Sequence, residues 1–204
     1  MIKVVLFDLG DTLVVEEEIQ GRHLQEVELQ KVPYVDHVLH ELKKRYKLGV
    51  VTNTTTSGEE HVRTALKKIG IERDFDVIVT SVDVGYEKPH EKIFLTALRK
   101  LCVKPNEAVM VGNRISKDVL GANKLGMTSI LYKWNERYLD KITSNLEKPD
   151  YTIKSLSEIL PTLSQYVKKK GFCGRIWEIS PDVYDSNHPY RSYTLKHYPS
   201  RENK

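Results

Sequence analysis

The sequence predicts an α/β fold in which a central parallel sheet is flanked by helices. Strand and helix signals alternate along residues 1–165, which is the pattern of successive βαβ units. Several strand signals are short, nearly continuous apolar runs, as expected for strands buried on both faces of a parallel sheet. Polar residues follow these runs directly, at the edge of such a sheet where ligands bind.

The first strand signal lies at the start of the chain. Residues 2–7 are apolar except for Lys3, and the run stops at Asp8. Burying an unpaired carboxylate is costly, so we expect Asp8 to pair with a metal ion or a cation, or to take part in chemistry. A structural Asp that caps a turn is the alternative that this segment alone leaves open.

The later elements follow from apolar spacing and from glycine and proline positions. A helical segment is expected over residues 16–31, and Pro33 opens a helix that runs to about residue 46 with apolar residues three and four apart. The other helices are expected over residues 57–70, 89–101, 116–125 and 155–167, and the other strands over residues 48–51, 75–80, 108–111, 128–132 and 151–153.

Length and composition fit one ordinary globular domain with an appendage. The chain has 204 residues, of which 40% are hydrophobic and 29% charged. No apolar run approaches the ~20 residues that span a bilayer, so we expect no membrane contact. The first strand begins at once, and we therefore expect no signal peptide. Cys102 and Cys173 lack metal-ligand spacing, which favours a reducing, cytoplasmic location without disulfides.

Charge is concentrated at the end of the chain. We therefore divide the sequence into a domain of residues 1–165 and a basic, Tyr-rich C-terminal extension of residues 166–204, whose eight basic and four acidic residues account for the whole net charge of +4. The extension carries Trp177, Tyr184, Tyr190, Tyr193 and Tyr198. Such a strip could bind nucleic acid. Its aromatic density also suits docking onto the body or onto a second subunit in a homodimer, which we favour.

Three further motifs follow Asp8 in order along the chain. They are Thr52-Asn53 after Val50-Val51, Lys88-Pro89, and Gly112-Asn113 followed by Asp118. Over roughly residues 1–165 these four motifs resemble the haloacid dehalogenase (HAD) superfamily. The resemblance implies a three-layer Rossmann-like fold and, as in most members, a magnesium-dependent phosphohydrolase acting on a small-molecule phosphoester.

The resemblance also implies a role for each motif residue. Asp8 is the implied nucleophile, forming an aspartyl-phosphate that water then hydrolyses. Thr52, with Asn53 beside it, would hold a phosphate oxygen, and Lys88 would steady the nucleophile and the transferred group. Arg114, in the loop of the last motif, would lie at the mouth of the site and contact substrate or face water. A Thr that merely ends a strand and a solvated surface Lys are the plainer interpretations.

The same resemblance implies a Mg²⁺ site built from oxygen ligands. Asp8, the backbone carbonyl of Gly10 and the side chain of Asn113 would be the ligands, because Mg²⁺ takes oxygen ligands and keeps several waters. Asp118 would act through a water molecule or hold Lys88 in place. An Asp118 that only caps a helix or pairs at the surface is the alternative.

Two residues depart from the phosphatase pattern. Gly10 stands where the pattern has a second Asp that protonates the leaving group and activates water, and Asp11 stands where it has glycine. Loss of a positioned acid/base costs ~10²–10⁴-fold in rate, so we expect substrates with good leaving groups, such as acyl, aryl or anomeric phosphates. Asp11 would substitute only in a rearranged loop. Asn113 replaces a usual Asp, which weakens metal binding by one charge.

These departures keep two other functions open. One is a catalytically weak or inactive HAD-fold protein that binds a partner. The other is a hydrolase of the 2-haloacid dehalogenase kind, whose branch also has Asn at the position of Asn113 and lacks the second Asp. The intervals from Thr12 to Thr52 and from Thr52 to Lys88 are too short for a separate cap domain, so we expect an open site unless the extension or a partner covers it.

Overall fold

The computed structural model describes residues 1–16, 22–138, 140–169, 174–179 and 193–198. They belong to two compact units, Met1–Leu156 and Ser157–Lys204. The closing helix of the sequence therefore falls in the second unit, and the division at residue 165 stays a prediction. Among the described residues, no helix has both the length and the apolar character that crossing a bilayer requires.

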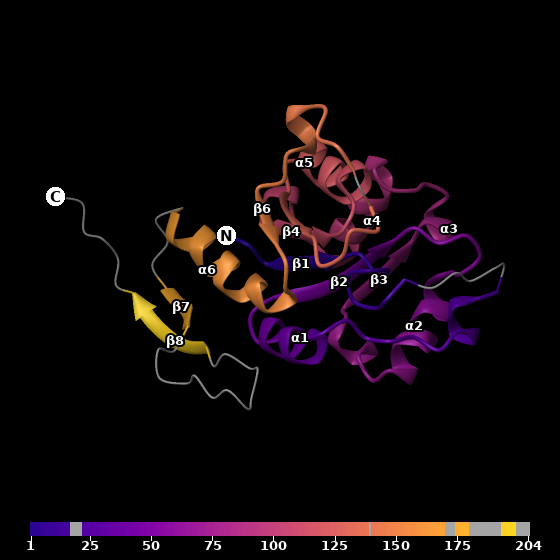
Figure 1. Ribbon diagram of the computed structural model, residues 1–204, viewed down its shortest axis with the longest axis horizontal. Helices are drawn as coiled ribbons and strands as arrows, with labels where there is room; N and C mark the ends of the chain where they lie inside the picture. The colour runs from indigo at the N-terminus through magenta and orange to yellow at the C-terminus, as the bar shows by residue number, and fades with distance from the viewer. Residues whose placement is uncertain (17–21, 139, 170–173, 180–192, 199–204) are drawn as a thin grey trace. The chain divides into compact units, whose positions relative to one another are not determined.

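The first unit is built on one six-stranded parallel sheet in the order β3-β2-β1-β4-β5-β6 (Figure 1). Its strands are β1 (Val4–Phe7), β2 (Lys47–Thr52), β3 (Val77–Thr80), β4 (Ala108–Gly112), β5 (Thr128–Tyr132) and β6 (Tyr151–Ile153). β1 to β4 are apolar runs buried along nearly their whole length, because helices cover both faces. The predicted α/β fold with a central parallel sheet is confirmed.

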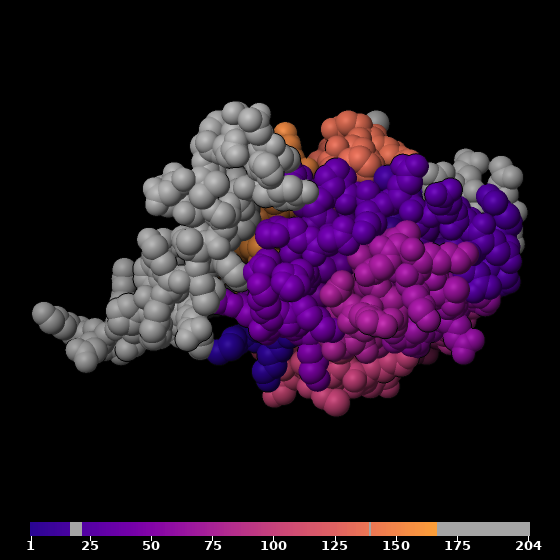
Figure 2. Space-filling model, turned by 90° about the horizontal axis from the view of Figure 1, so that it is seen from below, coloured from indigo at the N-terminus to yellow at the C-terminus, as the bar shows by residue number. Residues whose placement is uncertain are grey.

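Helices form a layer on each side of this sheet. α1 (Val35–Lys43) and α2 (Glu59–Lys68) lie on one side, and α4 (Glu91–Leu101) and α5 (Leu120–Leu125) lie on the other (Figure 1). Seen from below, most of the surface of this unit comes from the indigo-to-magenta part of the chain that contains α1 and α2 (Figure 2). A short helix α3 (Ser81–Val84) follows β3, and a π-helical turn precedes α5.

The order of the strands places a crevice beside β1. From β1 the chain moves outward to β2 and β3, and it then returns to the other side of β1 for β4, β5 and β6. The direction reverses between β1 and β4, and loops that leave neighbouring strands part at such a point. In register, Phe7 lies between Val50 of β2 and Val111 of β4, so the ends of these three strands lie close together.

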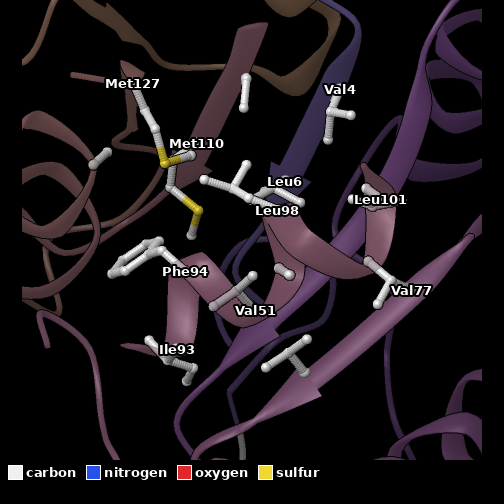
Figure 3. Packing of buried hydrophobic residues seen from close by; sticks show 14 residues of the cluster. Val4, Leu6, Val51, Val77, Ile93, Phe94, Leu98, Leu101, Met110 and Met127 are labelled. Atoms are coloured by element: carbon white, nitrogen blue, oxygen red, sulfur yellow. The ribbon is translucent and has the colours of Figure 1, made fainter. Parts of the chain in front are cut away.

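A hydrophobic layer fills the space between the sheet and α4 (Figure 3). It contains Ile93, Phe94, Leu98 and Leu101 from α4, Val4, Leu6, Val51, Val77 and Met110 from the sheet, and Met127 after α5. The α4 residues recur every three or four positions and so share one face of the helix. A Cβ on Gly121 would collide with the ring of Phe94, so glycine is what lets α5 approach α4 here.

The segment between β1 and α1 departs from the prediction. Its described part has only a 3₁₀ turn at Leu24–Glu26, so the helical segment predicted before α1 is wrong for those residues. The backbone pairs across the segment instead, because the Val15 N–H donates to the Gln30 carbonyl and the Val32 N–H donates to the Leu13 carbonyl.

The second unit contains secondary structure that the sequence did not indicate. Its α6 (Ile159–Lys169) corresponds to the helix predicted over residues 155–167. The two antiparallel strands that follow, β7 (Gly174–Ile179) and β8 (Tyr193–Tyr198), were not predicted. Trp177 lies in β7, and Tyr193 and Tyr198 lie in β8, whereas Tyr184 and Tyr190 lie outside the described residues.

Phe94→Ala tests the hydrophobic layer. Removing a fully buried ring leaves a cavity, so we expect the free energy of unfolding to fall by about 3–5 kcal/mol. Ile142, whose surface is 54% exposed, is the control, since its change to alanine should cost less than about 0.5 kcal/mol. Urea denaturation monitors both variants, and similar losses in the two would contradict the assignment of Phe94 to the core.

Candidate active site

Polar side chains from all four sequence motifs gather at the carboxyl edge of the sheet. Asp8 follows β1, Thr52 ends β2, and Asn113 follows β4, while Lys88 comes from the loop between α3 and α4. All four line one cavity of about 610 Å³. The observed order of strands, in which β1 lies between β2 and β4, brings Asp8, Thr52 and Asn113 together.

The centre of this cavity is a buried cation between two carboxylates. The Lys88 ammonium donates to Asp8 Oδ1 at 2.5 Å and to Asp118 Oδ1 at 2.7 Å. The side chain of Lys88 is 2% exposed and that of Asp118 is 1% exposed, while that of Asp8 is 11% exposed. Asp8 is therefore the member of the cluster that reaches the cavity most openly, and Lys88 is not the solvated surface lysine of the plainer interpretation.

Burial and neighbouring charge act together on these groups. Burial raises the pKa of Asp118 to about 6, and the charge of Asp8 adds to this, although Lys88 opposes it. Burial alone would lower the pKa of Lys88, but Asp118 and Asp8 outweigh it and raise that pKa above its usual value. Lys88 is thus held in its charged form, which is the form that can neutralise a transferred phosphoryl group.

The position of Asp118 is fixed by the main chain around it. Its Oδ2 accepts a hydrogen bond from the backbone N–H of Arg114 at 3.0 Å, while Oδ1 contacts Lys88. A Cβ on Gly112 would collide with the Asp118 carboxyl group, so only glycine leaves room for it. Of its two implied roles, holding Lys88 in place is the one with a direct contact.

Asn53 braces the loop that carries Lys88. Its Oδ1 accepts from the Lys88 N–H at 2.8 Å, and its Nδ2 donates to the Lys88 carbonyl at 3.2 Å. The amide group is therefore engaged with the main chain of another motif. Asn53 also lines the cavity, and its predicted contact with substrate stays a prediction.

Hydroxyl and cationic groups surround the rest of the polar wall. The Thr52 hydroxyl lies 3.5 Å from the Asn53 carbonyl, and Thr54 and Thr55 line the cavity beside it. Arg114 and Lys117 line it as well. The Arg114 guanidinium also lies 3.8 Å from the centre of the Tyr138 ring.

Asn113 is the residue that best fits a bound cation. Its Oδ1 and Nδ2 are both buried without a hydrogen-bond partner among the described residues, and the residue lines the cavity with Asp8 and Gly10. Within the described residues, no cluster of three or more His, Cys, Asp or Glu side chains could hold a metal ion. A Mg²⁺ site here would need the Asn113 amide and the Gly10 carbonyl beside the carboxylates, which are oxygen donors that Mg²⁺ accepts.

Asp11 does not face this cavity. Its φ of 51° lies in the left-handed region, where glycine is usual and Asp is tolerated. The carboxylate is fully buried: Oδ1 accepts from the Glu16 N–H at 3.0 Å, and Oδ2 lies 3.1 Å from Arg137 Nε. These contacts assign Asp11 to holding the first loop.

The loop after β5, which the sequence did not point to, contacts the loop that contains Asp11 and Glu16. After β5, the Trp134 indole N–H donates to the Asp11 carbonyl at 2.8 Å, and Arg137 donates to the Glu16 carbonyl at 2.8 Å. The Tyr138 hydroxyl donates to Glu16 Oε2 at 2.5 Å. Glu16 and Tyr138 both line the cavity, but no motif spacing relates residues so far apart.

The segment before α1 supplies an apolar wall. The apolar residues of this segment that line the cavity are Val14, Val15, Leu24, Val27 and Leu29. The segment is too short for a separate domain, yet it contributes lining residues beside the carboxyl edge of the sheet.

Comparison with known proteins gives concordant matches. A sequence model of the family described as haloacid dehalogenase-like hydrolase matches residues 14–132. The glyceraldehyde 3-phosphate phosphatase of Methanothermobacter thermautotrophicus is 37% identical over 132 residues, which are 64% of this chain and 56% of that protein. The pyrophosphatase PpaX of Bacillus mycoides is 35% identical over 168 residues, which are 78% of this chain and 74% of that protein.

A solved structure agrees with these sequence matches. The HAD phosphatase from Thermococcus onnurineus has a TM-score of 0.65 at 28% identity, and the match covers 79% of this chain and 98% of that one. Against the glyceraldehyde 3-phosphate phosphatases of two archaea, however, this chain spans less than 60% of the relative's length.

Lys88→Met tests the buried charge cluster. It leaves two buried carboxylates without their shared cation, so we expect the free energy of unfolding at neutral pH to fall by about 3–5 kcal/mol. Loss of Lys88 also raises the pKa of Asp118 further. Asp118 in the unchanged protein ionises near its pKa of about 6, whereas Asp118 in the variant keeps its proton to a higher pH. The deficit of the variant should therefore grow from about pH 6 and level off above the pKa of Asp118 in the variant.

Urea denaturation at several pH values, without added divalent metal, measures this deficit. Lys117→Met is the matched control, because Lys117 lies 3.6 Å from the exposed Glu87 and such a pair contributes at most about 1 kcal/mol. A deficit in Lys88→Met that is independent of pH would contradict the description of the cluster.

Proposed function

Since the chain belongs to the haloacid dehalogenase-like hydrolase family, we propose that it is a magnesium-dependent phosphohydrolase that works through an aspartyl-phosphate on Asp8. The observation that carries the proposal is the contact of the Lys88 ammonium with both Asp8 and Asp118. This cluster presents one carboxylate to a cavity whose wall also has Thr52 and Arg114. A nucleophile beside a fixed cation is what phosphoryl transfer requires.

In the first step, an Asp8 oxygen attacks phosphorus and the bond from phosphorus to the leaving oxygen breaks. The Thr52 hydroxyl binds one phosphoryl oxygen, and the Lys88 ammonium neutralises charge on the nucleophile and the transferred group. Arg114 binds the substrate near the mouth. Asp8, the Gly10 carbonyl and Asn113 would hold Mg²⁺, with Asp118 acting through a water molecule or holding Lys88, and the bound ion would supply further charge neutralisation.

Gly10 places no acid group beside the leaving oxygen. Substrates whose leaving group is stable as an anion are therefore favoured, which means acyl, aryl or anomeric phosphates. Two alternatives remain from the sequence: a binding protein with little catalysis and a 2-haloacid dehalogenase. In neither would Asp8 form an aspartyl-phosphate.

The cellular location, the substrate class and the partners of the protein are proposed from the sequence. We propose a cytoplasmic location, a small-molecule phosphoester as substrate and no membrane contact. The C-terminal extension of residues 166–204 is proposed to dock onto the body or to form a homodimer, with nucleic-acid binding as its alternative. Asn53 is proposed to contribute main-chain contacts to the substrate.

Asp8→Asn tests the nucleophile. With p-nitrophenyl phosphate and Mg²⁺ we expect turnover by the unchanged protein and a loss of at least about 10⁴-fold in the variant, because no other group replaces a covalent nucleophile. Nitrophenol release is measured beside the thermal unfolding of both proteins. Undiminished turnover in a folded variant, or no turnover by the unchanged protein across a panel of phosphoesters, would refute the proposal, and chloride release from chloroacetate would favour the dehalogenase.

Variants of Asn113 test the metal site. EDTA should abolish turnover and Mg²⁺ should restore it. Asn113→Asp adds a negative ligand and should lower the Mg²⁺ concentration for half-maximal activity, whereas Asn113→Ala should raise it, each by roughly 10-fold, the scale of one altered ligand interaction. A Mg²⁺ titration of activity gives these values, and identical midpoints in all three proteins would exclude Asn113 as a ligand.

A further inference from the structure

Hydrolysis of an aspartyl-phosphate requires a base that takes a proton from the attacking water. Identifying this base rests on the proposed function. Among the described residues, three carboxylates line the cavity: Asp8, Glu16 and Glu87. Asp8 carries the phosphoryl group at this stage, which leaves the other two.

Glu87 lies at the rim of the cavity and is engaged there. Its side chain is 64% exposed, its Oε2 lies 3.6 Å from the Lys117 ammonium, and the same oxygen accepts from Asn53 Nδ2 at 3.4 Å. A solvated group at the rim activates water no better than the solvent does.

Glu16 is less exposed than Glu87, with 42% of its side-chain surface exposed, and it lies against the main chain two residues after Asp8. A Cβ on Gly10 would lie 3.3 Å from Glu16 Cγ and 3.4 Å from its Cδ. The carboxyl end of Glu16 therefore occupies the space into which a side chain of residue 10 would extend. A side chain at residue 10 would require Glu16 to shift by a few tenths of an ångström.

Both the main chain and the side chain of Glu16 are anchored. Its N–H donates to Asp11 Oδ1, and its carbonyl accepts from Arg137. Its Oε2 accepts from the Tyr138 hydroxyl at 2.5 Å, and the Tyr138 ring is held against the Arg114 guanidinium at 3.8 Å. A base that is fixed in this way needs little reorganisation before proton transfer.

We propose that Glu16 is the general base of the dephosphorylation step and that Tyr138 is its positioning residue. As the water oxygen bonds to phosphorus, the bond from phosphorus to the Asp8 oxygen breaks and its electron pair returns to the Asp8 carboxylate. The proton of the attacking water passes to the Glu16 carboxylate and then to solvent. Inorganic phosphate leaves, and the enzyme regains its starting state.

Glu16→Gln separates the two half-reactions. With p-nitrophenyl phosphate and Mg²⁺, formation of the aspartyl-phosphate should proceed, while its hydrolysis should slow by roughly 10²–10³-fold, within the range for loss of a general base. Rapid-quench measurements should then show a burst of one nitrophenol per active site before slow turnover. The acid-quenched protein should carry one added phosphoryl group by intact mass, which a merely structural role of Glu16 would not produce.

Two further variants complete the test. Tyr138→Phe should show the same burst with a smaller loss, about 10-fold, and it carries the test if Glu16→Gln does not fold. Glu87→Gln is the matched carboxylate control and should turn over as the unchanged protein does, without a burst.

The outcomes separate this inference from the function on which it rests. Steady-state turnover of Glu16→Gln and Tyr138→Phe at the unchanged rate without a burst would overturn the role of Glu16 and leave the Asp8 mechanism standing. Failure of the unchanged protein to turn over any phosphoester would overturn both. An equal loss of rate in both half-reactions of Glu16→Gln, with no phosphoenzyme retained, would also overturn the role of Glu16 as general base.

Discussion

The Lys88 ammonium is the interaction on which the rest of the site depends. It is almost completely removed from water between Asp8 and Asp118, and a buried charge is tolerated only where partners compensate for lost hydration. Lys88 comes from a loop 80 residues after Asp8 and 30 residues before Asp118. One cation thus ties together three distant segments at the carboxyl edge of the sheet, and the geometry of the cavity follows from that tie.

Several backbone features serve this contact. Glycine at position 112 gives the Asp118 carboxyl group its space, and the Arg114 N–H holds the oxygen that Lys88 does not use. Asn53 fixes the main chain of Lys88 from the end of β2. Strand order sets the remaining geometry, because β1 lies between β2 and β4 in the sheet and its neighbours therefore bring Thr52 and Asn113 to Asp8.

The sequence predicted those parts that depend on local signals. Apolar runs that end in polar residues predicted the sheet and placed Asp8, Thr52 and Asn113 at one edge, since strand ends of a parallel sheet coincide. It missed the pairing of Tyr138 with Glu16, which depends on tertiary contacts between loops with no periodicity. The described part of the segment before α1 is not a helix because backbone hydrogen bonds join Val15 to Gln30 and Val32 to Leu13. Apolar spacing alone does not predict such pairing between distant residues.

The loop after β5 has a consequence for how this protein could diverge. Trp134 and Arg137 hold the first loop through the carbonyl oxygens of Asp11 and Glu16, and a carbonyl is present whichever side chain a residue bears. The placement of residue 16 in the cavity that Asp8 also lines is therefore largely independent of the side chain at position 16. Mutation can exchange the chemical group at that place while the scaffold keeps presenting it, so new reactions could be selected here without redesign of the loop.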